Sequence, residues 1–154
     1  LFKALATSRL GQHDKAIPMY DRIVEQSHDP GMRASALLAK SQYEPPREAW
    51  ALCEAVLALS SIDSLVWWDE GVAAWLIGEG ALDVGRYDLA LQLEERCLDL
   101  SRRGGWNVMH GHAGALVAWL YSLMGRLDEA AALIAETIPV ARRILGPNIT
   151  ILSV

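Results

Sequence analysis

The side chains that could catalyse a reaction or bind a metal ion are poorly spaced for either role. His110 and His112 are two residues apart, and side chains at that spacing on a helix point in different directions, which disfavours a shared metal ion. Asp69–Glu70 and Glu94–Glu95 are adjacent carboxylates, which cannot oppose one another as an acid and a base, so we interpret them as surface charges. The sequence contains neither a nucleophile elbow nor a phosphate loop. We therefore expect no catalytic residue, metal or cofactor.

Aromatic and acidic side chains point instead to recognition of another molecule. The 154 residues include six Trp. Trp68, Trp75, Glu79 and Asp83 recur at spacings of seven and four, which places them on one stripe of a predicted helix. Trp offers a large contact area with one polar group, which suits the centre of a binding groove. The alternative is packing between helices for each Trp, and a solvated helix face for Glu79 and Asp83.

A repeated turn organises the elements that would position these residues. It occurs at 11–16, 85–90 and 125–130, each time with a Gly that ends one helix, an Asp that starts the next, and an Ala one turn later. A degenerate copy with two prolines in place of Gly fits at 45–49. The anchor residues Ala16, Ala49, Ala90 and Ala130 are 33, 41 and 40 residues apart. Such periods indicate a solenoid of stacked helical hairpins.

The pattern predicts an all-α chain with helices over 2–10, 14–27, 32–42, 47–59, 65–84, 88–102, 106–124 and 128–145. The approximate repeats are 1–29, 30–63, 64–105 and 106–146, and 147–154 reads as the start of a truncated fifth unit. Both ends of the chain are apolar, so we expect a fragment of a longer protein, with homodimerisation or end-to-end association through those ends.

Residues around two of the turns resemble the tetratricopeptide repeat. In the third unit Gly78, Tyr87 and Ala90 match its small and aromatic positions, and in the fourth Tyr121, Gly125 and Ala130 do so. The resemblance is strong in these two units and weak in the first two. The units are about forty residues long where the norm is 34. Repeats of that length are similar to those of kinesin light chains and of sensor domains in bacterial regulators, and the composition favours the bacterial kind.

The resemblance implies a right-handed α-solenoid of about four antiparallel hairpins, whose first helices line a concave surface. It places six residues on the side that faces a ligand: Trp75, Glu79, Asp83, His112, Trp119 and Ser122. With Trp68, these form the predicted binding site for a peptide or a partner domain. The alternative is a small-molecule sensor or regulatory domain of a larger bacterial protein. A third hypothesis is an enzyme whose catalytic residues lie outside this segment.

Composition excludes some partners. The net charge is −5, which argues against nucleic-acid binding by this segment because phosphate binding needs a clustered basic surface. No apolar run is long enough to span a membrane. Cys53 and Cys97 lie within helical patterns, where buried free thiols are the favoured interpretation over a disulfide or a metal pair. We therefore expect a reducing, cytoplasmic setting.

Overall fold

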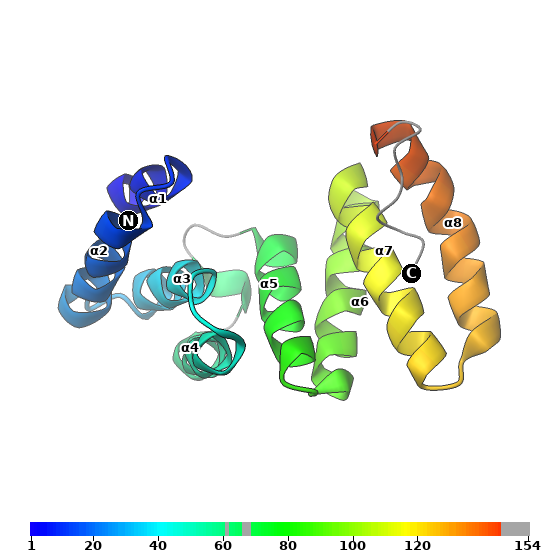
Figure 1. The fold of residues 1–154 in the computed structure, drawn as a ribbon, viewed down its shortest axis with the longest axis horizontal. Coiled ribbons are helices and arrows are strands. Elements are labelled where there is room, and N and C mark those ends of the chain that lie inside the picture. Colours follow the sequence, from blue (N-terminus) through cyan, green and yellow to red (C-terminus); the bar gives the residue numbers. More distant parts are fainter. Residues whose placement is uncertain (61, 66–68, 146–154) are drawn as a thin grey trace.

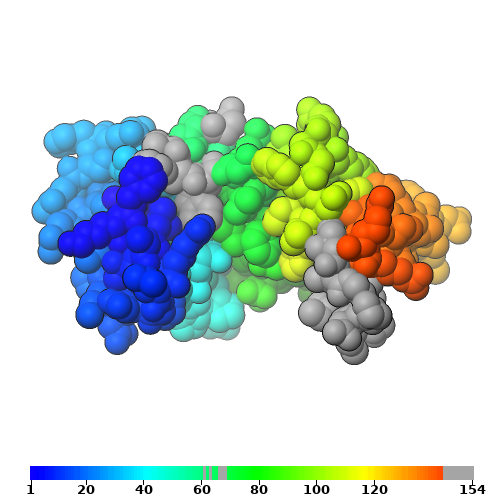
Figure 2. Space-filling model, turned by 90° about the horizontal axis from the view of Figure 1, so that it is seen from above, coloured from blue at the N-terminus to red at the C-terminus, as the bar shows by residue number. Residues whose placement is uncertain are grey.

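The computed structural model describes residues 1–60, 62–65 and 69–145, and all secondary-structure elements in this part of the chain are helices (Figure 1). Consecutive helices pack against one another, and the chain progresses from one end of the elongated molecule to the other (Figure 2). The fold is therefore the all-α helical-repeat solenoid that the sequence predicts. Its elements are α1 (Phe2–Arg9), α2 (His13–Gln26), α3 (Pro30–Ser41), α4 (Pro46–Leu59), a 3₁₀ turn η1 (Ile62–Ser64), α5 (Glu70–Asp83), α6 (Tyr87–Gly104), α7 (Asn107–Leu123) and α8 (Leu127–Leu145).

The repeated turn is confirmed, because its glycine adopts the same left-handed backbone in all three copies. The φ angles of Gly11, Gly85 and Gly125 are 74°, 78° and 75°, values that cost little only without a Cβ. At the second copy the Arg86 N–H donates to the Ala81 carbonyl at 2.8 Å, and the Gly85 N–H donates to the next carbonyl along. The same two bonds recur at the other copies. Each turn thus satisfies the last carbonyls of one helix while it reverses the chain.

The anchor alanines take the expected buried position in three hairpins. Ala16 and Ala90 are 0% exposed and Ala130 is 3% exposed. Ala49 is half-buried, but its N–H donates to the Pro45 carbonyl at 2.8 Å, so the second hairpin keeps the register without a turn glycine. The expectation that Asp starts each second helix is wrong by one residue. In α2 and α6 the cap positions are Gln12 and Arg86, and the acids lie in the first turn, where they favour the positive end of the helix dipole.

Two helices, α3 and α5, begin two or more residues from their predicted starts, because an aspartate caps each of them. Asp29 accepts from the N–H of Gly31 at 2.9 Å, and α3 therefore starts at Pro30. Asp69 accepts from the N–H of Gly71 at 2.8 Å, so α5 starts at Glu70 rather than at residue 65. Asp69 is thus a helix cap, which the interpretation as a surface charge missed. Trp68 and the predicted fifth unit at 147–154 lie outside the described residues.

The core runs along the solenoid as one large cluster from α3 to α8 and a smaller one at α1 to α3. Cys53 and Cys97 are 1% and 0% exposed and are free thiols, as predicted. Burial raises the pKa of both thiols, that of Cys97 to about 12, since a thiolate would lose its hydration there. Among the described helices, none combines the length and apolar character that a bilayer crossing requires.

Candidate functional site

Three of the predicted site residues meet where α5 lies beside α7. The Nε2 atom of His112 lies 3.0 Å from Oε1 of Glu79, within hydrogen-bond distance. The His112 ring also stands edge-on to the Trp75 ring, with centroids 5.1 Å apart and an interplanar angle of 83°. The contact therefore joins two successive hairpins through one aromatic ring, one carboxylate and one imidazole.

The turn glycines fix which side chains share this face. Glu79 stands six residues before Gly85 and Trp119 stands six residues before Gly125, so they occupy the same position in consecutive hairpins. Trp119 also follows His112 by seven residues, which places both on one side of α7. Trp119 is 43% exposed. The face of α5 and α7, defined here by Trp75, Glu79, His112 and Trp119, thus presents an acid–imidazole pair beside an exposed indole.

Asp83 and Ser122 are not part of the contact between Trp75, Glu79 and His112. Asp83 is exposed at the last residue of α5. The hydroxyl of Ser122 donates to the Ala118 carbonyl at 2.9 Å, and so it is bonded within its own helix. Trp68 lies outside the described residues. Trp75 is half-buried against the core, and no acceptor within the described part of the chain bonds its indole N–H.

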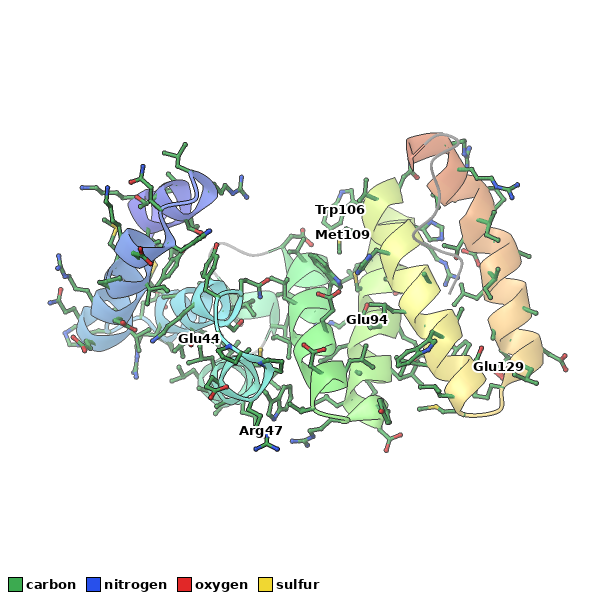
Figure 3. All side chains as sticks on the ribbon, in the orientation of Figure 1. Glu44, Arg47, Glu94, Trp106, Met109 and Glu129 are labelled. Carbon is green, nitrogen blue, oxygen red and sulfur yellow. The ribbon has the colours of Figure 1, made fainter. Side chains whose placement is uncertain are left out.

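Sequence reasoning missed Glu94, which is buried behind this face. Glu94 lies between α6 and α5 (Figure 3) and is 1% exposed, so its interpretation as a surface charge is wrong. Neither carboxyl oxygen has a hydrogen-bond partner among the described residues. Burial raises its pKa to about 9, and the charge of Glu79 adds to the effect. A signal was present: Glu94 follows Ala90 by four residues and precedes Cys97 by three, on the buried side of α6.

Glu95 also differs from its interpretation as a surface charge, because it is half-buried and accepts from the hydroxyl of Tyr121 at 2.6 Å. Arg126 stacks over the Tyr121 ring, 3.8 Å from its centroid. These contacts belong to the side of α6 that α7 covers. Glu95 and Tyr121 line a groove of about 440 Å³, whose lining also includes Arg102 of α6 and Glu136 of α8.

Glu136 of α8 pairs with one group of α6 and one group of α7. Arg102 donates to both of its carboxylate oxygens, at 2.8 and 2.7 Å, and His110 Nε2 lies 3.0 Å from Oε1. The Arg102 hydrogen bonds lower the pKa of Glu136, and His110 contributes less. His110 and His112 therefore contact different helices, as their spacing predicted. Within the described ranges, no three His, Cys, Asp or Glu residues are grouped as metal ligands would be.

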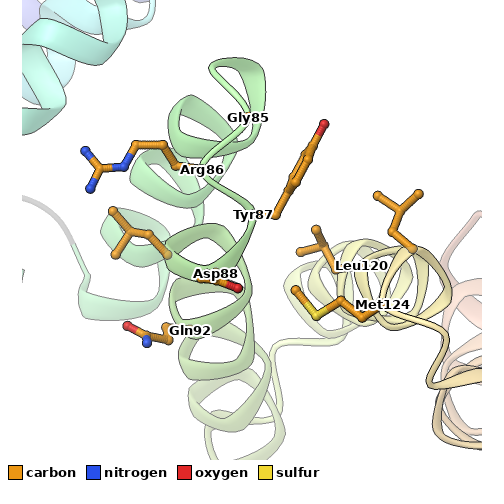
Figure 4. Close-up of a pocket in the computed structure, with 9 residues that line it drawn as sticks. Gly85, Arg86, Tyr87, Asp88, Gln92, Leu120 and Met124 are labelled. Carbon is orange, nitrogen blue, oxygen red and sulfur yellow. The ribbon is translucent and has the colours of Figure 1, made fainter.

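A second groove, of about 660 Å³, lies at the turn edge of the solenoid (Figure 4). The start of α6 and the end of α7 form it, and Tyr87, Leu123 and Met124 are exposed there. Asp88 and Gln92 add polar groups to its lining. No pattern in the sequence indicated this groove.

Comparison with known proteins identifies a repeat family in one segment of the chain. Residues 116–148 match the family model described as tetratricopeptide repeat. No curated protein and no solved structure matches the chain. The matched segment contains the second half of α7, the Gly125 turn and the described part of α8. The residues that resemble this repeat at sequence level, Tyr121, Gly125 and Ala130, lie within it. The chain is therefore an all-α helical-repeat protein in which residues 116–148 are similar to the tetratricopeptide repeat, a repeat that suggests a protein–protein interaction module.

Proposed function

We propose that this chain is a non-catalytic interaction module that binds a peptide or a partner domain on the face of α5 and α7. The observation that carries the proposal is the cluster of Trp75, Glu79 and His112 beside the exposed ring of Trp119. Two successive first helices of the hairpins contribute to it, as expected of a surface that follows a repeat. The tetratricopeptide match over 116–148 supports a protein partner.

The chemistry of the face favours a segment with a basic and an apolar group. Glu79 and His112 are 39% and 44% exposed at their side chains, and an exposed pair of this kind is weak enough to be exchanged for a stronger one. A Lys or Arg of a partner would add a charge-assisted bond to Glu79. Trp119 would then bury its ring against an apolar side chain of the same segment. The net charge of −5 also favours a basic partner.

The small-molecule alternative has one observation in its favour, the groove at the turn edge. Its volume of about 660 Å³ falls within the range of ligand pockets. However, Tyr87, Leu123 and Met124 remain exposed around it, whereas a small ligand is held best in a closed cavity. We therefore rank this function second.

Selection from a displayed peptide library, followed by affinity measurement with synthetic peptides, tests the first proposal. We expect Trp119→Ala and Glu79→Gln each to weaken binding by roughly tenfold or more, the loss of one central contact. Tyr87→Ala is the matched control, because this ring is 46% exposed on α6 and lies outside the proposed face. Peptides that bind both face variants normally but lose affinity for Tyr87→Ala would move the site to the groove and contradict the proposal.

A further inference from the structure

The outer side of α8 exposes positions that are buried in α6. Gly85 and Gly125 place the two helices in register, so Leu91, Glu94 and Leu98 of α6 correspond to Ala131, Ile134 and Ile138 of α8. The three α6 residues are 9%, 1% and 3% exposed. In α8, by contrast, Ile134 is 43% exposed, Ala131 is exposed and Ile138 is half-buried. The same side of the helix is thus covered in one hairpin and open in the next.

The two helices differ in exposure because a further helix, α7, packs beside α6. On α6, Gly78 of α5 lies against Glu94. The adjacent Glu95 bonds Tyr121 of α7, so α7 covers the part of this side next to Glu95 and Leu98. Among the described elements, α7 is the one that packs extensively against α8, and α8 is the last described helix of the row (Figure 1). We call the uncovered residues the α8 stripe. They recur at spacings of three and four and lie on one side of the helix: Leu127, Ala131, Ile134, Ala135 and Ile138.

Opposite charges stand at the two ends of the α8 stripe. Asp128 and Arg142 each lie seven residues from Ala135, so both fall on the side of the stripe. Both are exposed, and within the described residues neither forms an ion pair. Their neighbours are engaged: Glu129 pairs with Arg126, and Arg143 donates to the Pro139 carbonyl. The stripe is therefore an apolar surface with one free acid at its start and one free base at its end.

This arrangement is complementary to itself in one orientation. We propose that the α8 stripe binds the α8 stripe of a second copy of this chain, antiparallel, about a two-fold axis at Ala135. Asp128 of each protomer then faces the partner subunit's Arg142, and the pair occurs twice because the interface is isologous. The alanines near the axis let the two helices approach closely, while Ile134 and Ile138 fill the contact. The antiparallel direction also opposes the two helix dipoles.

Charge reversal in trans tests the proposal with the 154-residue chain. We expect sedimentation equilibrium to give a dimer for the wild type. Asp128→Arg and Arg142→Asp should each raise the dimer dissociation constant by roughly tenfold or more, because each places two like-charged contacts in the interface. An equimolar mixture of the two variants should restore dimers, since one protomer then carries only bases at these positions and the other only acids. A parallel pairing would place each position against its own copy, so the wild type would already carry two like-charged contacts and neither variant would weaken it further; an end-to-end contact would not depend on these two residues.

Glu25→Arg is the matched control, because Glu25 is exposed on α2 and the change in net charge equals that of Asp128→Arg. It should leave dimerisation unchanged. Ile134→Ser is a second variant that weakens the apolar contact without any change in charge, and circular dichroism checks that every variant is folded. A wild type that is monomeric at all concentrations would overturn the proposal. Larger open oligomers, or a dimer that no α8 variant weakens, would also overturn it.

Discussion

The carboxyl group of Glu94 lies against the bare backbone of Gly78. A Cβ atom added to Gly78 would stand 2.7 Å from Oε1 of Glu94 and 3.3 Å from its Cγ. The glycine therefore makes room in α5 for an acidic side chain of α6, and the exclusion of water raises the pKa of that side chain to about 9. In the folded protein at neutral pH, Glu94 is uncharged.

The free energy of unfolding should therefore fall as pH rises from about 4.5 to about 9. In the unfolded chain the Glu94 carboxyl has its ordinary pKa of 4.5, and in the folded chain about 9. Below the lower value both states hold the proton, and between the two values only the folded state holds it, so the free energy of unfolding decreases with rising pH. The slope from this one proton approaches about 1.4 kcal/mol per pH unit. Urea unfolding at a series of pH values measures it.

Glu94→Gln removes this titration and should flatten the pH dependence. The variant should match the wild type at the acid end and exceed its stability increasingly toward the alkaline end. Glu95→Gln is the control, since the neighbouring carboxylate is bonded to Tyr121; its pH profile should keep the wild-type slope. Parallel curves for wild type and Glu94→Gln would contradict a neutral, buried Glu94.

Gly114→Ala should destabilise the last hairpin, because the added methyl group would collide with a rigid neighbour. Its Cβ would lie 2.9 Å from Cγ2 and 3.2 Å from Cβ of Thr137, which is 2% exposed. Such overpacking costs about 1–3 kcal/mol, more than the helix propensity that Ala gains. Thermal unfolding measures the loss. Adding Thr137→Ala should recover most of it, and a double variant no more stable than Gly114→Ala would refute this contact as the cause.

The repeat architecture could be predicted from sequence because local chemistry encodes it. A left-handed glycine such as Gly85 and a small residue such as Ala90 leave a mark within a few positions, and the structure confirms both. The start of α5 could not be placed in the same way, since apolar residues continue the helical pattern upstream of it. The cap at Asp69 decides where the helix begins, and one Asp among several polar residues nearby carries little signal.

The candidate site could likewise be predicted only in part from the sequence. Helical spacing alone put Trp75 and Glu79 on one stripe, and the family resemblance put His112 on the same surface. Their contact depends on how one hairpin stacks on the next, a long-range property that spacing within a helix does not determine. Glu94 was missed for another reason. Its position follows the buried pattern of α6, but a charged residue type outweighed that pattern, since acids are rarely buried without a partner.

Gly125→Ala tests the turn geometry that defines the repeat. Gly125 has a φ of 75° and no atom within 4 Å of an added Cβ, so any cost comes from backbone strain and not from a clash. That strain is about 1–2 kcal/mol for an L-residue in the left-handed region. Gly125→Asn should cost less, because Asn tolerates this conformation better. Equal or higher melting temperatures for Gly125→Ala than for wild type would contradict the left-handed turn.

Trp75 and Trp119 should respond differently to removal if one belongs to the core and the other to a surface. Trp75 packs on the main core while Trp119 is 43% exposed. We expect Trp75→Ala to lower the free energy of unfolding by about 3 kcal/mol, and Trp119→Ala to change it by less than about 1 kcal/mol. In the folded state, a neutral quencher should reduce emission less in Trp119→Phe than in wild type, since an accessible indole is lost; Trp75→Phe should not have this effect. If Trp119→Ala unfolded the chain, Trp119 would be a packing residue and the proposed binding face would lose its exposed anchor.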